Sequence, residues 1–528
     1  MPFCLETFFR AEKKKSLTAF MGSTKGALGN LARSAVIVFS GTVLGRGFGL
    51  LAQILIIQSL APQTFGHIAL AYTIVISTSR IGLLGLHDGV SRLLSSSSGS
   101  NKQINIIRSG VLIGMVFSFL LIATLYLFRG EIGGIMNDAI MADYLPLLLP
   151  FISFYILGRI LFGIIRAQEY FLGGIFARDL TPQIGALLIL AGSLAIFKPQ
   201  IAAIHYWLSV YLIMSIASIL LIRNEFGIGE LFSESPPKRE IKDLWSFSWP
   251  LAIGSVVFLF LSNLDILMLG YFSDAKAVGF YRSIQPLKQV TTFVMSSFTF
   301  LFLPLATKFY EENKESDLKS LFAVSTKWIT AATLPPVLVF TLFADDAIAA
   351  FFTQAYVAAA PALSVLMIGL FSRALVGLNG DMVRAIDRTR IELYSSIAGV
   401  IVNFIFNIIL IPSYGIVGAA IGTVLGYLVY NGTEVVAIYR YTGVHPFVLD
   451  NIKQIIPTIC LAILMWWLLN SVQLKLLQLV GIGVLLTAFQ PLSTVFTGSL
   501  SEDDQILITR IEDRLGREIP LIQGYLPK

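Results

Sequence analysis

Long apolar runs separated by short polar connections follow one another along almost the whole chain. The segment NFIFNIILIPSYGIVGAAIGTVLGY, residues 403–427, contains two such runs, which are separated by Pro412, Ser413, Tyr414 and Gly415. Runs of about 20 apolar residues have the length at which an α-helix crosses a bilayer, whereas a barrel strand needs only about 10 alternating residues. Proline ends one helix because it lacks an N–H, and glycine lets the chain turn into the next. The pattern therefore predicts a series of membrane-spanning helices.

Fourteen spans are predicted in this way, and the chain is expected to be an all-α polytopic membrane protein. Composition agrees, because 55% of the 528 residues are hydrophobic and only 13% are charged, compared with about 25% charged residues in soluble domains. The predicted spans are residues 34–58, 66–90, 106–128, 145–166, 175–197, 204–223, 246–270, 279–304, 323–344, 360–380, 393–411, 416–438, 454–470 and 478–496.

The distribution of positive charge predicts the orientation. If the N-terminus is cytoplasmic, 28 of the 38 Lys and Arg residues fall on inside segments or within five residues of the inner end of a span, four fall outside and six lie deeper within spans. Such an excess of inside Lys and Arg indicates cytoplasmic termini in the cell membrane. The net charge of +6 is then a sign of topology rather than of nucleic-acid binding.

No cofactor or metal site is predicted. The four histidines are scattered without the spacing of metal ligands. Cys4 lies in the predicted cytoplasmic tail and Cys460 in a predicted span, so a disulfide is not expected. The first 33 residues are basic and polar, and the apolar run after them is too long for the core of a cleavable signal peptide.

Two weak internal repeats predict a duplicated architecture. Residues 54–66 align with residues 266–279, and IRAQE at 165–169 resembles VRAID at 383–387, at offsets of 212 to 218 residues. Six spans separate equivalent points, so both copies enter the membrane in the same direction. The expected parts are a basic N-terminal tail, a first lobe, a cytoplasmic inter-lobe loop, a second lobe, two further spans and an amphipathic C-terminal tail: 1–33, 34–223, 224–245, 246–438, 454–496 and 497–528.

The strings NLDILMLGYFSDAKAVGFYRS and NFIFNIILIPSYGIVGAAIGT resemble the polysaccharide-transporter branch of the MOP (multidrug/oligosaccharidyl-lipid/polysaccharide) superfamily. The resemblance covers about residues 30–495. It implies two six-helix lobes around a central cavity. It also implies a flippase that moves a lipid-linked oligosaccharide on a polyisoprenyl phosphate from the cytoplasmic to the outer leaflet, for cell-surface glycan assembly. Membrane lipids and the components of a glycan polymerase or ligase are the expected partners.

Basic residues inside the spans are the candidate ligands of the substrate headgroup. Burying one costs about 2.5–3.5 kcal/mol at a helix centre on insertion scales, so each should face a cavity or a partner. A guanidinium offers a fork of donors that matches phosphate oxygens, which favours a cationic chamber for a phosphate-linked headgroup. The alternative is that each arginine pairs with a carbonyl or carboxylate between helices. The candidates are Arg46, Arg80, Arg159, Arg373 and Lys288.

Acidic residues inside the spans have other expected roles. Asp265 and Arg282 lie at similar depths near the outer ends of adjacent spans, so a structural ion pair is predicted. Glu434 lies near the inner end of its span, where its side chain is expected to reach the membrane surface.

Two other classes of protein remain as alternatives to the flippase. A cation-coupled multidrug exporter of the same superfamily should carry buried acids in its first lobe, but the charges near the middle of that lobe are arginines. An enzyme acting on the same lipid should carry a substantial outer loop with catalytic groups. The longest outside loop, residues 129–144, is about sixteen residues long, so no enzymatic activity is expected.

Overall fold

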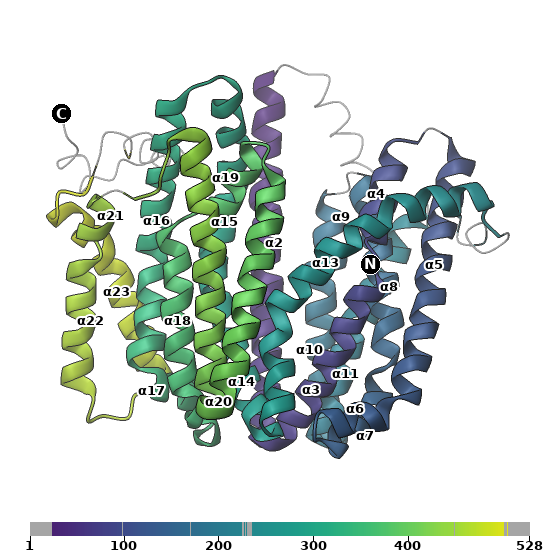
Figure 1. Ribbon diagram of the computed structural model, residues 1–528, viewed down its shortest axis with the longest axis horizontal. Helices are drawn as coiled ribbons and strands as arrows, with labels where there is room; N and C mark the ends of the chain where they lie inside the picture. The colour runs from purple at the N-terminus through teal and green to yellow at the C-terminus, as the bar shows by residue number, and fades with distance from the viewer. Residues whose placement is uncertain are drawn as a thin grey trace. The chain divides into compact units, whose positions relative to one another are not determined.

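The computed structural model describes residues 24–97, 99–168, 171–223, 226, 227, 229, 235–447, 449–500 and 504, apart from some side chains within its helices. Only helical elements occur among these residues (Figure 1). The chain divides into two compact units, Met1–Leu259 and Phe260–Lys528, which are described separately. This is the polytopic all-α architecture that the apolar pattern predicts.

Four helices of the first unit begin with a proline in their first turn. Pro62, Pro150, Pro182 and Pro199 each occupy the first turn of a helix, where the missing N–H removes no intrahelical bond. The elements are α2 (Thr24–Ser59), α3 (Pro62–Gly82), α4 (Leu86–Ser95), α5 (Ser100–Leu127), α6 (Arg129–Ile135), α7 (Ala139–Leu148), α8 (Pro150–Ala167), α9 (Phe171–Ile175), η1 (Phe176–Leu180), α10 (Thr181–Ile196) and α11 (Pro199–Ile222), followed by α13 (Lys238–Phe272), which continues into the second unit.

The second unit packs around a cluster of buried apolar side chains from α15, α16, α18, α19 and α20, including Phe302, Phe322 and Ile438. Pro286 occupies the first turn of α15, so it begins that helix instead of kinking it. The elements after α13 are α14 (Ala275–Ser283), α15 (Gln285–Glu311), α16 (Glu315–Leu342), α17 (Ala344–Phe351), η2 (Gln354–Ala359), α18 (Ala360–Leu375), α19 (Asn379–Ala385), α20 (Thr389–Thr442), α21 (Leu449–Lys453), α22 (Ile456–Leu469) and α23 (Leu476–Phe496).

The 54 residues of α20 form a hairpin of two arms, as the quoted segment predicts. Gly415 has φ 53° and ψ −128°, a conformation that side chains with a Cβ disfavour. The two arms run side by side in Figure 1, and a Cβ on Gly426 would lie 2.9 Å from the carbonyl oxygen of Gly399 on the other arm. Glycine is therefore required both at the turn and where the two backbones approach each other.

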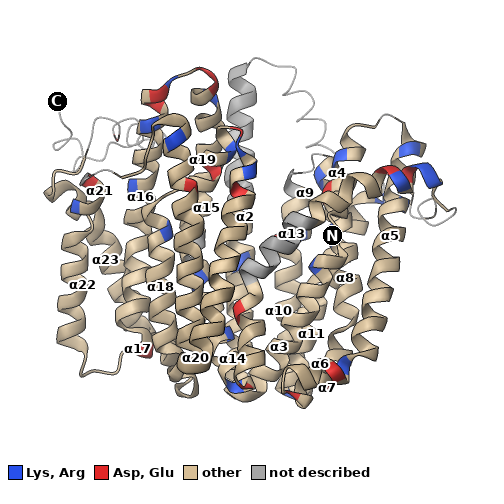
Figure 2. Ribbon diagram, viewed as in Figure 1, with Lys and Arg blue, Asp and Glu red and all other residues tan. Residues whose placement is uncertain are grey.

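The number of spans is compatible with the expected fourteen. Among the described residues, eleven helices have the length and composition to cross a membrane. The number is twelve if the bent pair Ala275–Thr299 and Phe302–Glu311 forms one span, and α20 enters these counts as a single helix although it turns back at Gly415. The charged positions of each unit gather at the helix ends, and few lie along the middle (Figure 2).

Several predicted boundaries differ from the structure. The predicted span 66–90 is broken between α3 and α4, and the predicted span 360–380 is broken between α18 and α19. A glycine with positive φ occupies each break, Gly85 at 70° and Gly377 at 67°. Apolar periodicity does not reveal such breaks, because both halves of the span remain apolar.

Two predicted connecting segments are partly helical. Helix α2 begins at Thr24 and so includes the end of the predicted tail 1–33, and α13 begins at Lys238, inside the predicted loop 224–245. Neither stretch contains a proline that would stop the helix at the edge of the apolar run. The other residues of the N-terminal tail, Cys4 included, and the predicted C-terminal amphipathic helix, apart from Asp504, lie outside the described residues.

Candidate functional site

Arg80 lies in the last turn of α3, directly before the break in the second span. Leu84 (φ 48°) and Gly85 (φ 70°) separate α3 from α4. A Cβ on Gly85 would lie 2.7 Å from the carbonyl oxygen of Ser248, so α13 packs directly against the break. The free carbonyl groups at the end of a helix favour a nearby cation by about 0.3–1 kcal/mol. The break therefore helps to accommodate the arginine inside the span.

Arg159, on the neighbouring helix α8, belongs to the same part of the first unit. The charges of both arginines act on the hydroxyl of Tyr211, which lies on α11. Arg80 Nη1 and Arg159 Nε are buried, and neither has a hydrogen-bond partner among the described residues. Because buried polar groups are rarely left unpaired, these two nitrogens indicate that a ligand or water completes the site.

Aromatic rings from α3, α8 and α11 pack beside these arginines. Tyr155, one helical turn before Arg159, packs on Tyr211 with a centroid separation of 4.8 Å. Tyr72 stacks on Trp207 at 4.3 Å and meets the edge of Phe151 at 5.4 Å. The aromatic packing holds the three helices together next to the two guanidinium groups, and apolar spacing alone did not single out these residues.

A second charged cluster lies at the predicted cytoplasmic end of α8. Arg166 Nη2 donates to Asp88 Oδ1 at 2.6 Å and Arg166 Nε donates to Ser91 Oγ at 3.1 Å, which joins α8 to α4. His87 Nδ1 is buried and has no hydrogen-bond partner among the described residues. Arg166 is therefore paired, in contrast to Arg80 and Arg159.

The corresponding cluster of the second unit has the same chemistry. Arg384 occupies the place of Arg166 in the internal repeat. Its Nη1 donates to Asp381 Oδ1 at 3.2 Å, and its Nε and Nη2 donate to the two carboxylate oxygens of Glu392 at 3.0 and 2.5 Å. In both copies of the repeat, this arginine is used to join helices.

Arg373 lies in the last turn of α18, before the break at Gly377. It thus resembles Arg80, which also precedes a break, although the two positions are not equivalent in the internal repeat. Arg373 Nε is buried and has no hydrogen-bond partner within the described part of the chain. The charge of Arg373 acts on Glu434, on the second arm of α20. Glu434 is completely buried, so the prediction that it reaches the membrane surface is wrong.

Asp265 belongs to a buried polar network at the junction of α13, α14 and α20. Its Oδ2 accepts hydrogen bonds from the hydroxyls of Tyr281 at 2.6 Å and Thr423 at 3.3 Å. Asn403 donates to Thr423 Oγ1 at 3.3 Å, so both arms of the hairpin take part. Arg282 follows Tyr281 in the chain, and its ion pair with Asp265 stays a prediction.

The remaining candidates have different surroundings. Arg46 is exposed on α2, and Lys288 is partly buried on α15. Arg46, Arg80 and Arg159 belong to the first unit, and Arg373 and Lys288 belong to the second. A chamber that joins all five therefore stays a prediction. No group of three or more His, Cys, Asp or Glu that could hold a metal occurs within the described residues.

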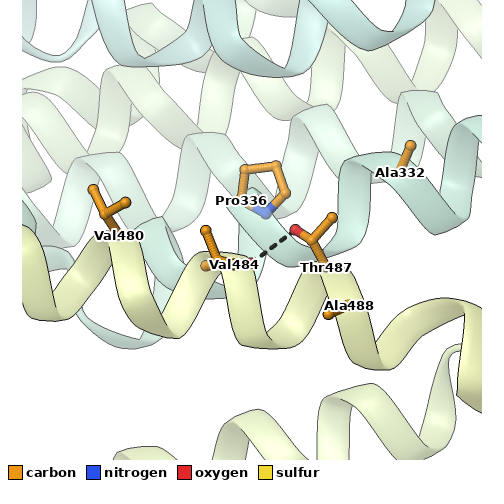
Figure 3. A pocket seen from close by; sticks show the side chains of 7 residues that line it. Ala332, Pro336, Val480, Val484, Thr487 and Ala488 are labelled. Atoms are coloured by element: carbon orange, nitrogen blue, oxygen red, sulfur yellow. Dashed lines mark hydrogen bonds between the residues drawn. The ribbon is translucent and has the colours of Figure 1, made fainter.

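An apolar groove of about 560 Å³ lies between α16 and α23 (Figure 3). Pro336 lines it on α16, and Val480, Val484 and Thr487 line it on α23. The hydroxyl of Thr487 donates its proton to the carbonyl oxygen of Gly483 at 2.7 Å, so this donor is already used within the helix. The groove offers no charge to a polar headgroup, and its chemistry suits apolar chains.

Two family models match the chain. The model described as "Polysaccharide biosynthesis protein" matches residues 31–310, and the model described as "MatE" matches residues 250–409. A protein of Haloferax volcanii, described as "Probable low-salt glycan biosynthesis flippase Agl15", is 21% identical over 403 residues, which are 76% of this chain and 82% of that protein.

Two further comparisons give another relative in sequence and a solved structure with a similar fold. The "Uncharacterized membrane protein MJ1068" of Methanocaldococcus jannaschii is 28% identical over 235 residues, which are 42% of this chain and 44% of that protein, so the match spans less than half of its length. The solved structure "Lipid II flippase MurJ, inward closed conformation" aligns with a TM-score of 0.67 and 15% identity, covering 86% of this chain and 98% of that one. At this identity, the structural likeness concerns the fold.

Proposed function

Because the chain belongs to the polysaccharide biosynthesis protein family, in the polysaccharide-transporter branch of the MOP superfamily, we propose that it is a flippase for a lipid-linked oligosaccharide. The substrate moves from the cytoplasmic to the outer leaflet of the cell membrane, for the assembly of a surface glycan. The similarity to a probable glycan biosynthesis flippase over 82% of that protein supports this proposal. The protein carries out transport without catalysing a reaction, and both of its termini are cytoplasmic.

Three buried arginine nitrogens have no hydrogen-bond partner among the described residues, and this observation supports an anionic headgroup. They are Arg80 Nη1, Arg159 Nε and Arg373 Nε. Structural arginines of this chain, such as Arg166 and Arg384, are instead paired with carboxylates. A buried guanidinium nitrogen without an acceptor is costly unless a ligand uses it, and the oxygens of a phosphate or pyrophosphate match such donors. The phosphate that joins lipid and sugar is the proposed ligand.

Transport follows from alternating access of the two lobes around the headgroup. In this proposal Arg46 holds the phosphate together with Arg80, Arg159, Arg373 or Lys288, while the apolar tail stays in the bilayer. Moving an anion outward across a membrane that is negative inside is favoured by about 2.3 kcal/mol per charge and 100 mV. The membrane potential is thus sufficient to bias the direction, and coupling to an ion is not required.

A cation-coupled multidrug exporter is the second candidate, because the MatE model matches residues 250–409. An exporter of organic cations is expected to carry unpaired buried acids in its first lobe. Asp138, a buried acid of the first unit, is paired with His67, whose Nδ1 lies 2.7 Å from both carboxylate oxygens. The buried polar atoms of the first unit that have no hydrogen-bond partner among the described residues include Arg80 Nη1 and Arg159 Nε, which favours an anionic substrate.

Charge reversal at Arg46 tests the flippase proposal. Arg46→Glu should abolish the appearance of lipid-linked oligosaccharide in the outer leaflet of intact cells. Arg46→Lys should keep part of the activity, because it keeps the charge and loses the fork of donors. Lys198→Glu, at an exposed site before α11, is the matched control and should remain active. Wild-type flipping by well-folded Arg46→Glu protein would contradict the cationic headgroup site.

A further inference from the structure

The beginning of α13 carries two lysines and two tryptophans on one face. Lys238, Lys242, Trp245 and Trp249 follow one another at intervals of four, three and four residues, a spacing that aligns side chains along a helix. Both lysines are exposed, and the tryptophans are 38% and 49% exposed. A single exposed aromatic residue needs no explanation, but aligned side chains of two chemistries indicate a defined surface. These four residues form the lysine–tryptophan stripe.

The buried face of the same helix fixes the direction of the stripe. Leu244 and Ser248 are completely buried. A Cβ built on Gly89 of α4 would lie 3.0 Å from Leu244 Cδ1, and one built on Gly110 of α5 would lie 3.6 Å from Leu244 Cδ2. The beginning of α13 therefore packs on α4 and α5 of the first unit, and the stripe faces away from them.

Two ring contacts hold this part of α13 in place. Trp245 stacks on Phe117 of α5, with a centroid separation of 5.6 Å and an interplanar angle of 19°. Phe247 lies on the side of α13 away from the stripe, and the guanidinium of Arg92 on α4 lies 5.0 Å from its ring centroid. Because an anchored indole loses little conformational freedom when a ligand binds beside it, the stripe is preorganised at Trp245.

The positive charges of the stripe are not neutralised by the protein. Neither Lys238 nor Lys242 pairs with a carboxylate among the described residues, whereas Arg239 Nε lies 3.9 Å from Asp243 Oδ2. Glu240 is partly buried, and it lies two residues after Lys238, about 200° around the helix. The two ammonium groups are therefore available to an anion that approaches from outside the protein.

The position of the stripe along α13 matches the surface of a membrane. With 35 residues, α13 is about 52 Å long and exceeds a hydrocarbon layer of about 30 Å. Both lysines precede the predicted span 246–270, and the tryptophans lie at its edge. Lysines directly outside a span lie among the lipid headgroups, and tryptophan prefers the interface below them. The orientation predicted from the charge distribution places this end of α13 at the cytoplasmic leaflet.

We propose that the lysine–tryptophan stripe is a binding site for an anionic phospholipid of the cytoplasmic leaflet. Lys238 and Lys242 bind the phosphate of its headgroup, and the indoles of Trp245 and Trp249 contact the glycerol region and the upper part of its chains. A zwitterionic lipid binds less well, because its own cation offsets the phosphate charge. The inference goes beyond the proposed function, since the stripe lies on the outer surface of the first unit and requires no glycan on the lipid.

The two tryptophans report contact with the lipid directly. The full chain is reconstituted in phosphatidylcholine nanodiscs with increasing fractions of dibrominated phosphatidylglycerol or, for comparison, of dibrominated phosphatidylcholine. Bromine quenches the fluorescence of indoles that it touches, so the excess quenching by the anionic lipid gives its relative affinity. Wild-type protein should show this excess, and Trp245→Phe/Trp249→Phe should lose it. Equal quenching of the wild type by the two lipids, or an undiminished excess in the tryptophan variant, would overturn the inference.

Substitution of the lysines tests the headgroup contact. Lys242→Gln should lower the relative affinity for phosphatidylglycerol about fivefold, and Lys238→Gln/Lys242→Gln should lower it about 25-fold. Lys238→Arg/Lys242→Arg should stay close to the wild type, because both charges remain. Size-exclusion chromatography confirms that each variant is folded. A wild-type preference for phosphatidylglycerol in Lys238→Gln/Lys242→Gln would contradict the site.

Arg239→Gln is the matched control. It also removes one positive charge from the exposed beginning of α13, but a charge that already faces Asp243. Its effect on the relative affinity should be much smaller than that of Lys242→Gln. Equal losses in these two variants would mean that net charge attracts the lipid without a site, and would overturn the inference. Because the nanodiscs contain no lipid-linked oligosaccharide, these results are independent of the flippase proposal.

Discussion

Lys327 and Asp504 form a buried ion pair that ties the end of the described chain to α16. The ammonium of Lys327 donates to the carboxylate of Asp504 and, at 2.5 Å, to the carbonyl oxygen of Ser499. Trp328 Nε1 donates to Asp504 Oδ1 at 3.0 Å. The two charged side chains are only 5% and 0% exposed. The segment after α23 is therefore part of the packed second unit at this point.

Breaking this pair on one side should destabilise the protein strongly. Lys327→Met leaves the Asp504 carboxylate buried without its cation, and the expected loss is about 3–5 kcal/mol of unfolding free energy. The double variant Lys327→Met/Asp504→Leu should recover much of this loss. The measurement is thermal unfolding in detergent, followed by size-exclusion chromatography.

The exposed pair between Lys453 and Asp450 provides the control, because its side chains are 54% and 33% exposed. Lys453→Met should cost less than about 1 kcal/mol. Similar losses of unfolding free energy in Lys327→Met and Lys453→Met would show that burial does not make the Lys327–Asp504 pair more important for stability.

The turn of the α20 hairpin should not tolerate a side chain. Gly415→Ala places a Cβ at φ 53° and ψ −128°, and the expected cost is about 1–3 kcal/mol. Gly432→Ala is the matched control, because a Cβ there meets no atom within 4 Å and the backbone is helical. It should be neutral or slightly stabilising. Folded yield and thermal stability are the measurements, and equal stability of the two variants would contradict the strained turn.

The network around Asp265 predicts a coupling between two substitutions. Tyr281→Phe removes the 2.6 Å hydrogen bond to the buried carboxylate, which should cost about 1.5–3 kcal/mol. After Asp265→Asn, the same Tyr281 change should cost less, because the acceptor is no longer charged. Purely additive losses in this double-mutant cycle would mean that the contact contributes little.

The predicted pair of Asp265 with Arg282 is tested in the same way. If the two charges meet, Asp265→Asn or Arg282→Gln alone should reduce the folded yield, because each leaves a poorly solvated charge. The double variant should restore much of the yield. A double variant as poor as the two single losses combined would argue that they do not pair, and that Asp265 depends on its hydroxyl donors.

The topology is tested by labelling single cysteines from outside intact cells. In a background without Cys4 and Cys460, cysteines at positions 137 and 274 should react with an impermeant maleimide. Position 137 lies between α6 and α7, and position 274 lies between α13 and α14. Cysteines at positions 25 and 505 should remain unlabelled until the cells are opened. Labelling at 505 in intact cells would place the C-terminus outside.

The sequence by itself determined the class of protein and much of its helical framework. Apolar runs of membrane-spanning length, and the turn at Gly415, follow from local rules, because each helix must satisfy its own backbone and face lipid. The arginines inside the spans could be recognised for the same reason, since an isolated charge is costly in hydrocarbon. Arg80, Arg159 and Arg373 are partly buried, and each has one buried donor nitrogen without a partner among the described residues.

Only the tertiary structure decided which charges are already paired. The sequence does not show that Arg166, at the end of α8, binds Asp88 on α4, because this contact depends on which helix packs against that end. Glu434 was expected near the surface from its distance to the helix end, yet packing against Gly380 buries it completely. Pairing and burial arise from contacts between segments far apart in the chain. They are therefore set by the packing of helices rather than by the pattern along any one of them.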